Sequence, residues 1–120
     1  MPELPEVQTV VNHIKRDLMG EKLRSIIPLW DKVLHNFSPS DIHKELNGKV
    51  IIDVYRRAKF IILQFNGRII AIHLRMTGKL YISSDSGHPK HCTAFIEFNS
   101  GKKLIFEDVR KFGRFYLYND

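Results

Sequence analysis

The most reactive group that this sequence can offer is at its N-terminus, in the hexapeptide Met-Pro-Glu-Leu-Pro-Glu. A small second residue normally permits removal of the initiator methionine, which would leave Pro2 as an N-terminal secondary amine. An α-amino group titrates near pH 8, against about 10.4 for lysine, so part of it is neutral at physiological pH and can attack an electrophilic carbon. Glu3 would stand beside it as an acid or base. The alternative is structural: Pro5, Glu3 and Glu6 suit the first turn of a helix, and for the hexapeptide alone this is the simpler explanation.

A second candidate region is a stretch of one charge sign in the middle of the chain. Residues 54–79 contain no Asp or Glu, and their basic residues are Arg56, Arg57, Lys59, Arg68, Arg75 and Lys79. Such a stretch is typical of a phosphate-binding face. It is equally compatible with a solvated sheet face whose acidic partners are distant in sequence.

The motif His-Leu-Arg-Met-Thr-Gly at 73–78 lies within this stretch, at the end of an apolar run. Strand alternation predicts His73 and Arg75 on one face, with Leu74 and Met76 on the other. Lys59 directly precedes another apolar run and is expected at a strand end. The structural alternative is a core methionine, a partly buried histidine and a lysine that only reaches toward water.

A third candidate is the segment Asp-Val-Arg-Lys-Phe-Gly-Arg at 108–114. An aromatic or methionine side chain can wedge into a base stack while neighbouring cations hold phosphates or the orphaned base. Phe112 with Arg110 and Lys111 fits that description. By itself the segment is also an ordinary charged turn.

Two helices are expected to frame these candidates. Apolar residues recur at helical spacing, which predicts a helix over about 5–19 that ends before Gly20; they are Val7, Val10, Val11, Ile14 and Leu18. The pattern Ser-Pro-Ser-Asp at 38–41 is typical of a capping box and predicts a second, short helix that ends near residue 47.

The remaining apolar runs have strand length. They span 22–30, 49–56, 59–65, 68–74, 79–83, 93–98, 103–107 and 114–118. Asn66-Gly67 is a strong tight-hairpin signal, and Asn99-Ser100-Gly101 is a looser one. We therefore predict an α+β, mainly β, domain: a two-layered antiparallel β-sandwich of about eight strands flanked by two α-helices.

Composition narrows the function classes. The 120 residues fit one domain, and 19 Lys and Arg against 13 Asp and Glu give a formal charge of +6, which favours polyanionic partners. The sequence has neither a transmembrane-length apolar run nor a signal-peptide pattern, so we expect a cytoplasmic protein without membrane contact. Cys92 is the only cysteine, and the six histidines lack metal-site spacing. We expect a monomer with no cofactor of its own.

Four motifs together resemble the N-terminal domain of bacterial formamidopyrimidine-DNA glycosylases. MPELPEV, the lysine of RRAKFIIL, HLRMTG and DVRKFGR occur in the order and spacing of that family, over essentially all 120 residues. Leu4 is similar to this branch rather than to the related endonuclease VIII branch, which tends to carry glycine there. The resemblance implies a nucleoid-associated enzyme of base-excision repair that acts on damaged double-stranded DNA.

The resemblance also implies roles for individual residues. Pro2 would attack C1′ of the damaged nucleotide, form an imine and permit β,δ-elimination. Glu3 matches the acid/base for sugar-ring opening and Glu6 a second acid that organises the site. Lys59 and His73 match contacts to phosphates near the lesion. The residues that match DNA contacts and the filling of the gap left by the everted nucleotide are Arg75, Met76, Arg110, Lys111 and Phe112.

The sequence departs from the family in three places and in length. Gln8 stands where many relatives have an acid, and Val109 stands where a proline is common. Thr93 replaces a second histidine, so only a DNA contact is assigned to His91. We expect the family's helix-two-turn-helix domain and four-cysteine zinc finger to be absent from residues 1–120, which would form the catalytic domain only. The alternative function is therefore a catalytically incompetent DNA-binding fragment that lacks this clamp.

Overall fold

The computed structural model describes residues 3–120, which form two helices and eight strands. Helix α1 spans Leu4–Leu18 and buries four of the five predicted apolar positions, Val7, Val11, Ile14 and Leu18, while Val10 is only partly buried. Helix α2 spans Pro39–Leu46. The predicted capping box is present there, since the Ser38 hydroxyl accepts from the Asp41 N–H and the Asp41 carboxylate accepts from the Ser38 N–H.

The strands form two antiparallel sheets of four. Their bounds are β1 Leu23–Pro28, β2 Asp53–Arg57, β3 Phe60–Gln64, β4 Arg68–His73, β5 Lys79–Ser83, β6 Cys92–Phe98, β7 Lys103–Glu107 and β8 Arg114–Asn119. One sheet has the order β1-β6-β7-β5, and the other has the order β2-β3-β4-β8. The predicted antiparallel sandwich is confirmed.

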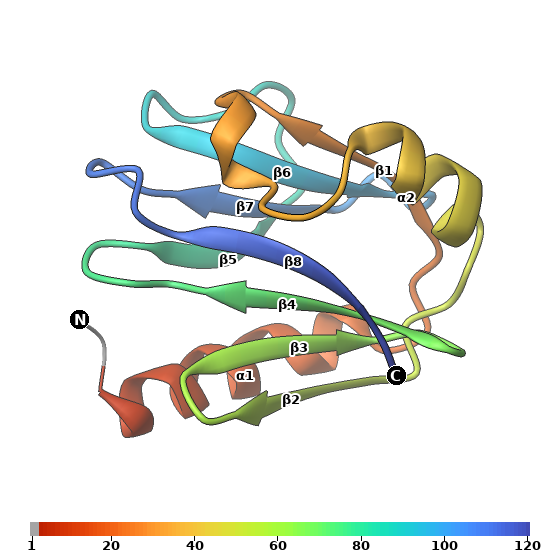
Figure 1. Ribbon diagram of the computed structural model, residues 1–120, viewed down its shortest axis with the longest axis horizontal. Coiled ribbons are helices and arrows are strands. Elements are labelled where there is room, and N and C mark those ends of the chain that lie inside the picture. The colour runs from red at the N-terminus through yellow and green to blue at the C-terminus, as the bar shows by residue number, and fades with distance from the viewer. Residues whose placement is uncertain (1–2) are drawn as a thin grey trace.

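The helices close the two open sides of the sandwich. Helix α1 packs against β2 and β5, which are the edge strands of the two sheets on one side (Figure 1). On the other side α2 packs against β1, and a 3₁₀ turn, η1 at Asp31–Val33, packs against β8. The sequence pattern did not predict this 3₁₀ turn.

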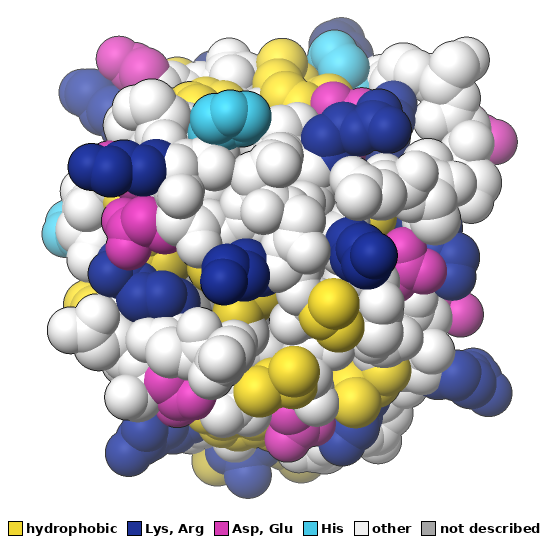
Figure 2. Space-filling model, turned by 90° about the vertical axis from the view of Figure 1, so that its right-hand side faces the viewer, with side chains coloured by type: hydrophobic (Ala, Val, Ile, Leu, Met, Phe, Trp, Pro, Cys, Tyr) yellow, Lys and Arg dark blue, Asp and Glu magenta, His cyan; other side chains and the backbone are white. Residues whose placement is uncertain are grey.

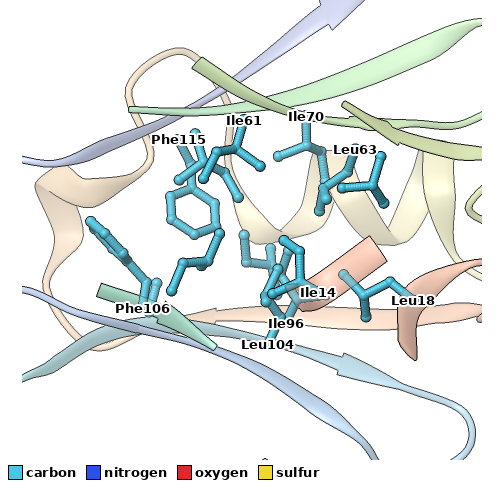
Figure 3. Close-up of a cluster of buried hydrophobic side chains, with 14 of the residues drawn as sticks. Ile14, Leu18, Ile61, Leu63, Ile70, Ile96, Leu104, Phe106 and Phe115 are labelled. Atoms are coloured by element: carbon cyan, nitrogen blue, oxygen red, sulfur yellow. The ribbon is translucent and has the colours of Figure 1, made fainter. Parts of the chain in front are cut away.

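The core lies between the sheets and under α1. Figure 3 shows Ile14 and Leu18 of α1 beside residues from both sheets, with the rings of Phe106 and Phe115 at one end of the cluster. Those two ring centroids are 5.5 Å apart. Burial of this apolar surface is the main stabilising contribution to the fold.

Turn chemistry sets the register of the hairpins. Gly67 has φ +85°, a value that L side chains rarely adopt, and it turns β3 back into β4 as the Asn-Gly pair predicts. Two strand predictions were too long: β1 covers 23–28 rather than 22–30, and residues 49–52 are not part of β2, although an isolated bridge joins Val50 to Lys22. The backbone N–H and carbonyl of Ile51 bond to Glu21 and Gly20 in the loop between α1 and β1, and the Lys49 carbonyl accepts from the Leu23 N–H at the start of β1.

Among the described residues, neither helix has the length and hydropathy that a membrane-crossing helix requires. The end of the sandwich that carries the β3–β4 hairpin displays mixed charge, with Lys and Arg interspersed among Asp and Glu (Figure 2). Arg68, at that hairpin, pairs with Glu45 of α2 at 2.7 Å. The basic residues of 54–79 therefore do not share one face, because Arg68 lies at the end of the sandwich opposite to Lys59 and Arg75.

Candidate nucleic-acid interface

Three turns and the start of α1 gather at one end of the sandwich, at the left of Figure 1. They are the β2–β3 turn at 58–59, the β4–β5 turn at 74–78 and the β7–β8 loop at 108–113. These are the segments that carry the three separate motifs singled out from the sequence. The antiparallel topology brings them together because β2, β4 and β7 all end at this side.

Each of these turns contains one residue in the left-handed region. The φ angles are +53° at Ala58, +58° at Arg75 and +59° at Lys111, and no other non-glycine residue of the described chain has a positive φ. Each directly precedes a predicted site residue: Lys59, Met76 and Phe112. A non-glycine residue in this conformation costs roughly 1 kcal/mol or more, and such strain concentrates at functional sites.

The first turn places Lys59 beside His73. Phe60 is the register partner of His73, and their rings meet edge to face at 5.0 Å. Partial burial lowers the pKa of His73, and the neighbouring charges of Arg75 and Lys59 lower this pKa further. At physiological pH the His73 ring is therefore neutral, and it can form hydrogen bonds beside the two cations.

Met76 lies on the surface, which corrects the prediction from strand alternation. Strand β4 ends at His73, and the left-handed Arg75 breaks the alternation, so Leu74 is buried while Met76 is 50% exposed. The alternative explanation of Met76 as a core residue is therefore wrong.

Phe112 lies on the same surface, 48% exposed. Arg110 stacks over its ring, with the guanidinium carbon 5.5 Å from the ring centroid. Met76, Phe112 and Arg75 line one cleft of about 630 Å³, together with His35, Arg114 and Tyr116. Two exposed apolar side chains surrounded by cations are what a wedge into a base stack requires.

Lys111 and His91 belong to a neighbouring cleft of about 300 Å³. Trp30 forms part of its wall, with the Lys111 ammonium 5.9 Å and the Arg114 guanidinium 4.9 Å from the indole ring. The structure thus places His91 near the DVRKFGR loop but outside the cleft that Met76 and Phe112 line. Cys92 in the same wall is buried, and burial raises the pKa of its thiol. The thiol therefore stays protonated, and Cys92 packs as a small apolar residue.

Glu3 and Glu6 are exposed at the beginning of α1. Glu3 is the N-cap residue, yet its side chain makes no capping hydrogen bond in the described part of the chain. Pro5 and Glu6 occupy the first turn as predicted. The predicted nucleophile, Pro2, lies outside the described residues.

Several residues of this surface were not assigned roles from the sequence: Trp30, His35, Arg114, Tyr116 and Thr77. Arg114 belongs to the quoted motif, and its cation next to Phe112 was an available signal. Trp30 and His35 come from the segment around η1, far from the motifs in sequence, and no local pattern marks them. Among residues 3–120 there is no cluster of three or more His, Cys, Asp or Glu that could hold a metal ion.

Comparison with known proteins gives one consistent result. The family model for the formamidopyrimidine-DNA glycosylase N-terminal domain matches residues 1–115. The formamidopyrimidine-DNA glycosylases of Mycoplasma genitalium and Protochlamydia amoebophila are 37% and 38% identical to this chain, over 98% and 100% of its length. The chain spans 43% and 45% of those two proteins, which is less than half of their length.

Solved structures agree with the sequence comparison. The Lactococcus lactis Fpg bound to DNA that contains an N7-benzyl-Fapy-dG matches with a TM-score of 0.89 and 34% identity, over 98% of this chain and 44% of that protein. The same enzyme bound to DNA with an abasic site matches with a TM-score of 0.89 and 33% identity, over 98% of this chain and 44% of that protein. This chain, with its two-sheet sandwich and its four motifs, therefore belongs to the formamidopyrimidine-DNA glycosylase family and corresponds to the N-terminal domain of that family.

Proposed function

We propose that this chain is the catalytic N-terminal domain of a bacterial base-excision repair enzyme. Its substrates would be oxidised purines, such as 8-oxoguanine and formamidopyrimidines, in double-stranded DNA, and it would cleave the strand after removing the base. The observation that carries this proposal is the clustering of exposed Met76 and Phe112 among cations at the end where α1 begins. The family membership and the DNA bound by the Lactococcus lactis relatives support it.

Phosphate binding is the first task of this surface. Lys59, which is partly buried, supplies a positive charge next to His73, and the exposed Arg75 adds a second cation. His73 accepts a hydrogen bond at Nδ1, so its proton resides on Nε2, where it can be donated to a phosphate oxygen. Lys111 and His91 of the neighbouring cleft extend the same surface.

Opening of the duplex is the second task. Moving a nucleotide out of the stack costs a few kcal/mol, and side chains that fill the vacated space offset this cost. Met76 and Phe112 are the exposed apolar side chains that line the larger cleft, and Val109 is exposed in the same loop as Phe112. Arg110, held over the Phe112 ring, would face the orphaned cytosine.

The chemical step would follow at C1′ of the everted nucleotide. The amine of Pro2 forms a bond to C1′ as the bond to the base breaks, and the base leaves with that electron pair and takes up a proton. Glu3 protonates the ring oxygen as the sugar opens, which yields the iminium form of the Pro2 adduct. This cation acidifies the C2′ proton, whose removal expels the 3′ phosphate, and a second elimination then expels the 5′ phosphate. Glu6 would help to organise the site.

We place the remaining family parts outside residues 1–120. The family's zinc finger requires four cysteines, whereas Cys92 is the only one here, so these residues do not fit that site and no step is assigned to zinc. A helix-two-turn-helix domain and this finger would form the other half of the DNA clamp. The working form would be a monomer on nucleoid DNA in the cytoplasm.

The proposal is tested with a duplex that carries one 8-oxoguanine opposite cytosine. We expect a strand break at the lesion, none in undamaged duplex, and loss of cleavage in Pro2→Gly but not in the loop control Pro89→Gly. Undiminished cleavage by Pro2→Gly would contradict the mechanism. The cleft that Met76 and Phe112 line would equally serve one alternative, a lesion-binding domain without catalysis. Selective binding without any strand break would support that alternative.

A further inference from the structure

A buried carboxylate joins the two segments that carry Met76 and Phe112. Asp108 is 1% exposed. One carboxylate oxygen, Oδ1, accepts a short hydrogen bond from the Thr77 hydroxyl, and the other, Oδ2, accepts from the Gly113 N–H at 2.7 Å. Thr77 lies in the β4–β5 turn and Gly113 in the β7–β8 loop, so a single side chain connects two segments that are 31 or more residues apart.

In each segment, Asp108 bonds to the residue that directly follows the exposed apolar side chain. Thr77 is the residue directly after Met76, and Gly113 is the residue directly after Phe112. The residues directly before them are the left-handed Arg75 and Lys111. Each apolar side chain is therefore fixed on its N-terminal side by a constrained backbone and on its C-terminal side by a bond to Asp108.

The ring of Phe106 supports both segments from the core. A Cβ atom at Gly78 would lie 2.7 Å from Phe106 Cε1, and one at Gly113 would overlap Phe106 Cζ. Both glycines are thus in close contact with the same fully buried ring. The backbone N–H of Asp108 donates to the His91 carbonyl at 2.9 Å, which fixes the carboxylate relative to β6.

We propose that Asp108 is a positioning residue that holds Met76 and Phe112 at a fixed separation, so that they enter the DNA stack as one unit. This inference rests on the proposed function. Charge-assisted hydrogen bonds to a buried carboxylate are strong and directional, so they suit this role. Asp108 itself does not reach the surface and would act on DNA only through the two side chains that it positions.

The test uses Thr77→Val, because removing Asp108 would leave the Gly113 N–H unsatisfied and endanger folding. Thr77→Val removes the link between the segments, together with the donor to Asp108 Oδ1, but keeps the bond to the Gly113 N–H, and Thr77→Ser restores the hydroxyl. The control is Thr93→Val, a buried threonine of β6 whose hydroxyl lies 3.5 Å from the Phe106 carbonyl. The readout is the ratio of two dissociation constants, for undamaged duplex and for duplex with an abasic-site analogue.

We expect Thr77→Val to lower this ratio about tenfold, the loss of one hydrogen bond to a charged group, with little change in affinity for undamaged duplex. Thr77→Ser and Thr93→Val should keep the ratio. General destabilisation would weaken binding to both duplexes, so a selective loss marks positioning. An unchanged ratio in Thr77→Val would overturn the proposal.

A second measurement on the free chain separates this proposal from the proposed function. Amide hydrogen exchange of Thr77→Val should accelerate in both segments, 74–78 and 108–113, if Asp108 couples them. Acceleration confined to 74–78 would overturn the coupling. If the proposed function is wrong, the protein without substitutions will bind both duplexes equally well. The exchange measurement would still show whether Asp108 couples the two segments.

Discussion

The backbone N–H of Arg75 donates a hydrogen bond to Nδ1 of His73 at 3.0 Å. The left-handed conformation of Arg75 turns the chain back after β4. One contact thus closes the turn before Met76 and sets the tautomer of His73. It also ties this part of the surface to the protonation state of His73, since a proton on Nδ1 would remove the acceptor.

This contact predicts how stability depends on pH. Unfolded His73 takes up a proton near pH 6.5, but its pKa in the folded chain is lower, so the unfolded state binds more protons as the pH falls. The His73 contribution is complete above about pH 6.5, is lost progressively below it, and levels off below the folded pKa. In urea unfolding across this range, His73→Gln should show a weaker loss of stability toward acid than the unaltered chain. The control His43→Gln, on the exposed face of α2, should keep the original slope.

Lys59 predicts a change in the salt dependence of DNA binding. If its ammonium neutralises one phosphate, Lys59→Gln should reduce the slope of log K against log salt by about 0.9 for duplex DNA. Lys44→Gln, an exposed lysine of α2 away from the three turns, is the matched control and should leave the slope unchanged. Equal slopes for all three proteins would show that Lys59 does not contact the backbone.

Ala58 predicts a gain in stability on substitution by glycine. Strands β2 and β3 are joined by two residues, Ala58-Lys59, and only the first has a positive φ, at a position where glycine is favoured. Ala58→Gly should raise the free energy of unfolding by about 0.5–1 kcal/mol, since relief of strain exceeds the added entropy of the unfolded chain. Ala94→Gly, at a buried strand position, should lower it. Chemical denaturation measures both, and a destabilised Ala58→Gly would show that the turn is not strained.

Gly113 predicts a severe steric effect. The Cβ of Gly113→Ala would overlap the Phe106 ring, and overpacking of this kind typically costs about 1–3 kcal/mol. The double variant Gly113→Ala with Phe106→Leu should recover part of that loss relative to the sum of the two single changes. Thermal unfolding of the four proteins gives the coupling directly, and simple additivity would contradict the contact.

The sequence predicted the helices, strands and turns of this fold better than it predicted which of them pack together. Helical spacing, the capping box at Ser38 and the Asn66-Gly67 turn act locally, and each was found where its pattern placed it. The stretch 49–52 was misassigned because only Ile51 is buried, with its backbone bonded to the loop before β1, while Val50 and Ile52 are exposed. A run of apolar residues does not by itself reveal which of its members are buried.

The surface itself was predictable in its motifs but not in its assembly. Lys59, Met76 and Phe112 were singled out one by one, and the topology brings their turns to one end. Strand alternation misplaced Met76, because one left-handed residue reverses the face on which the next side chain emerges. Trp30, His35 and Tyr116 could not be found, since only tertiary packing carries them to these clefts.

The proposed mechanism requires that the N-terminal amine of Pro2 forms an iminium adduct with damaged DNA. The chain would be incubated with duplex containing one abasic site, reduced with borohydride and weighed as intact protein. If the mechanism holds, the protein has lost Met1 and carries one covalent DNA adduct, which peptide mapping locates on Pro2. A protein without Met1 that forms no adduct, or an adduct that maps to a lysine, would contradict the mechanism.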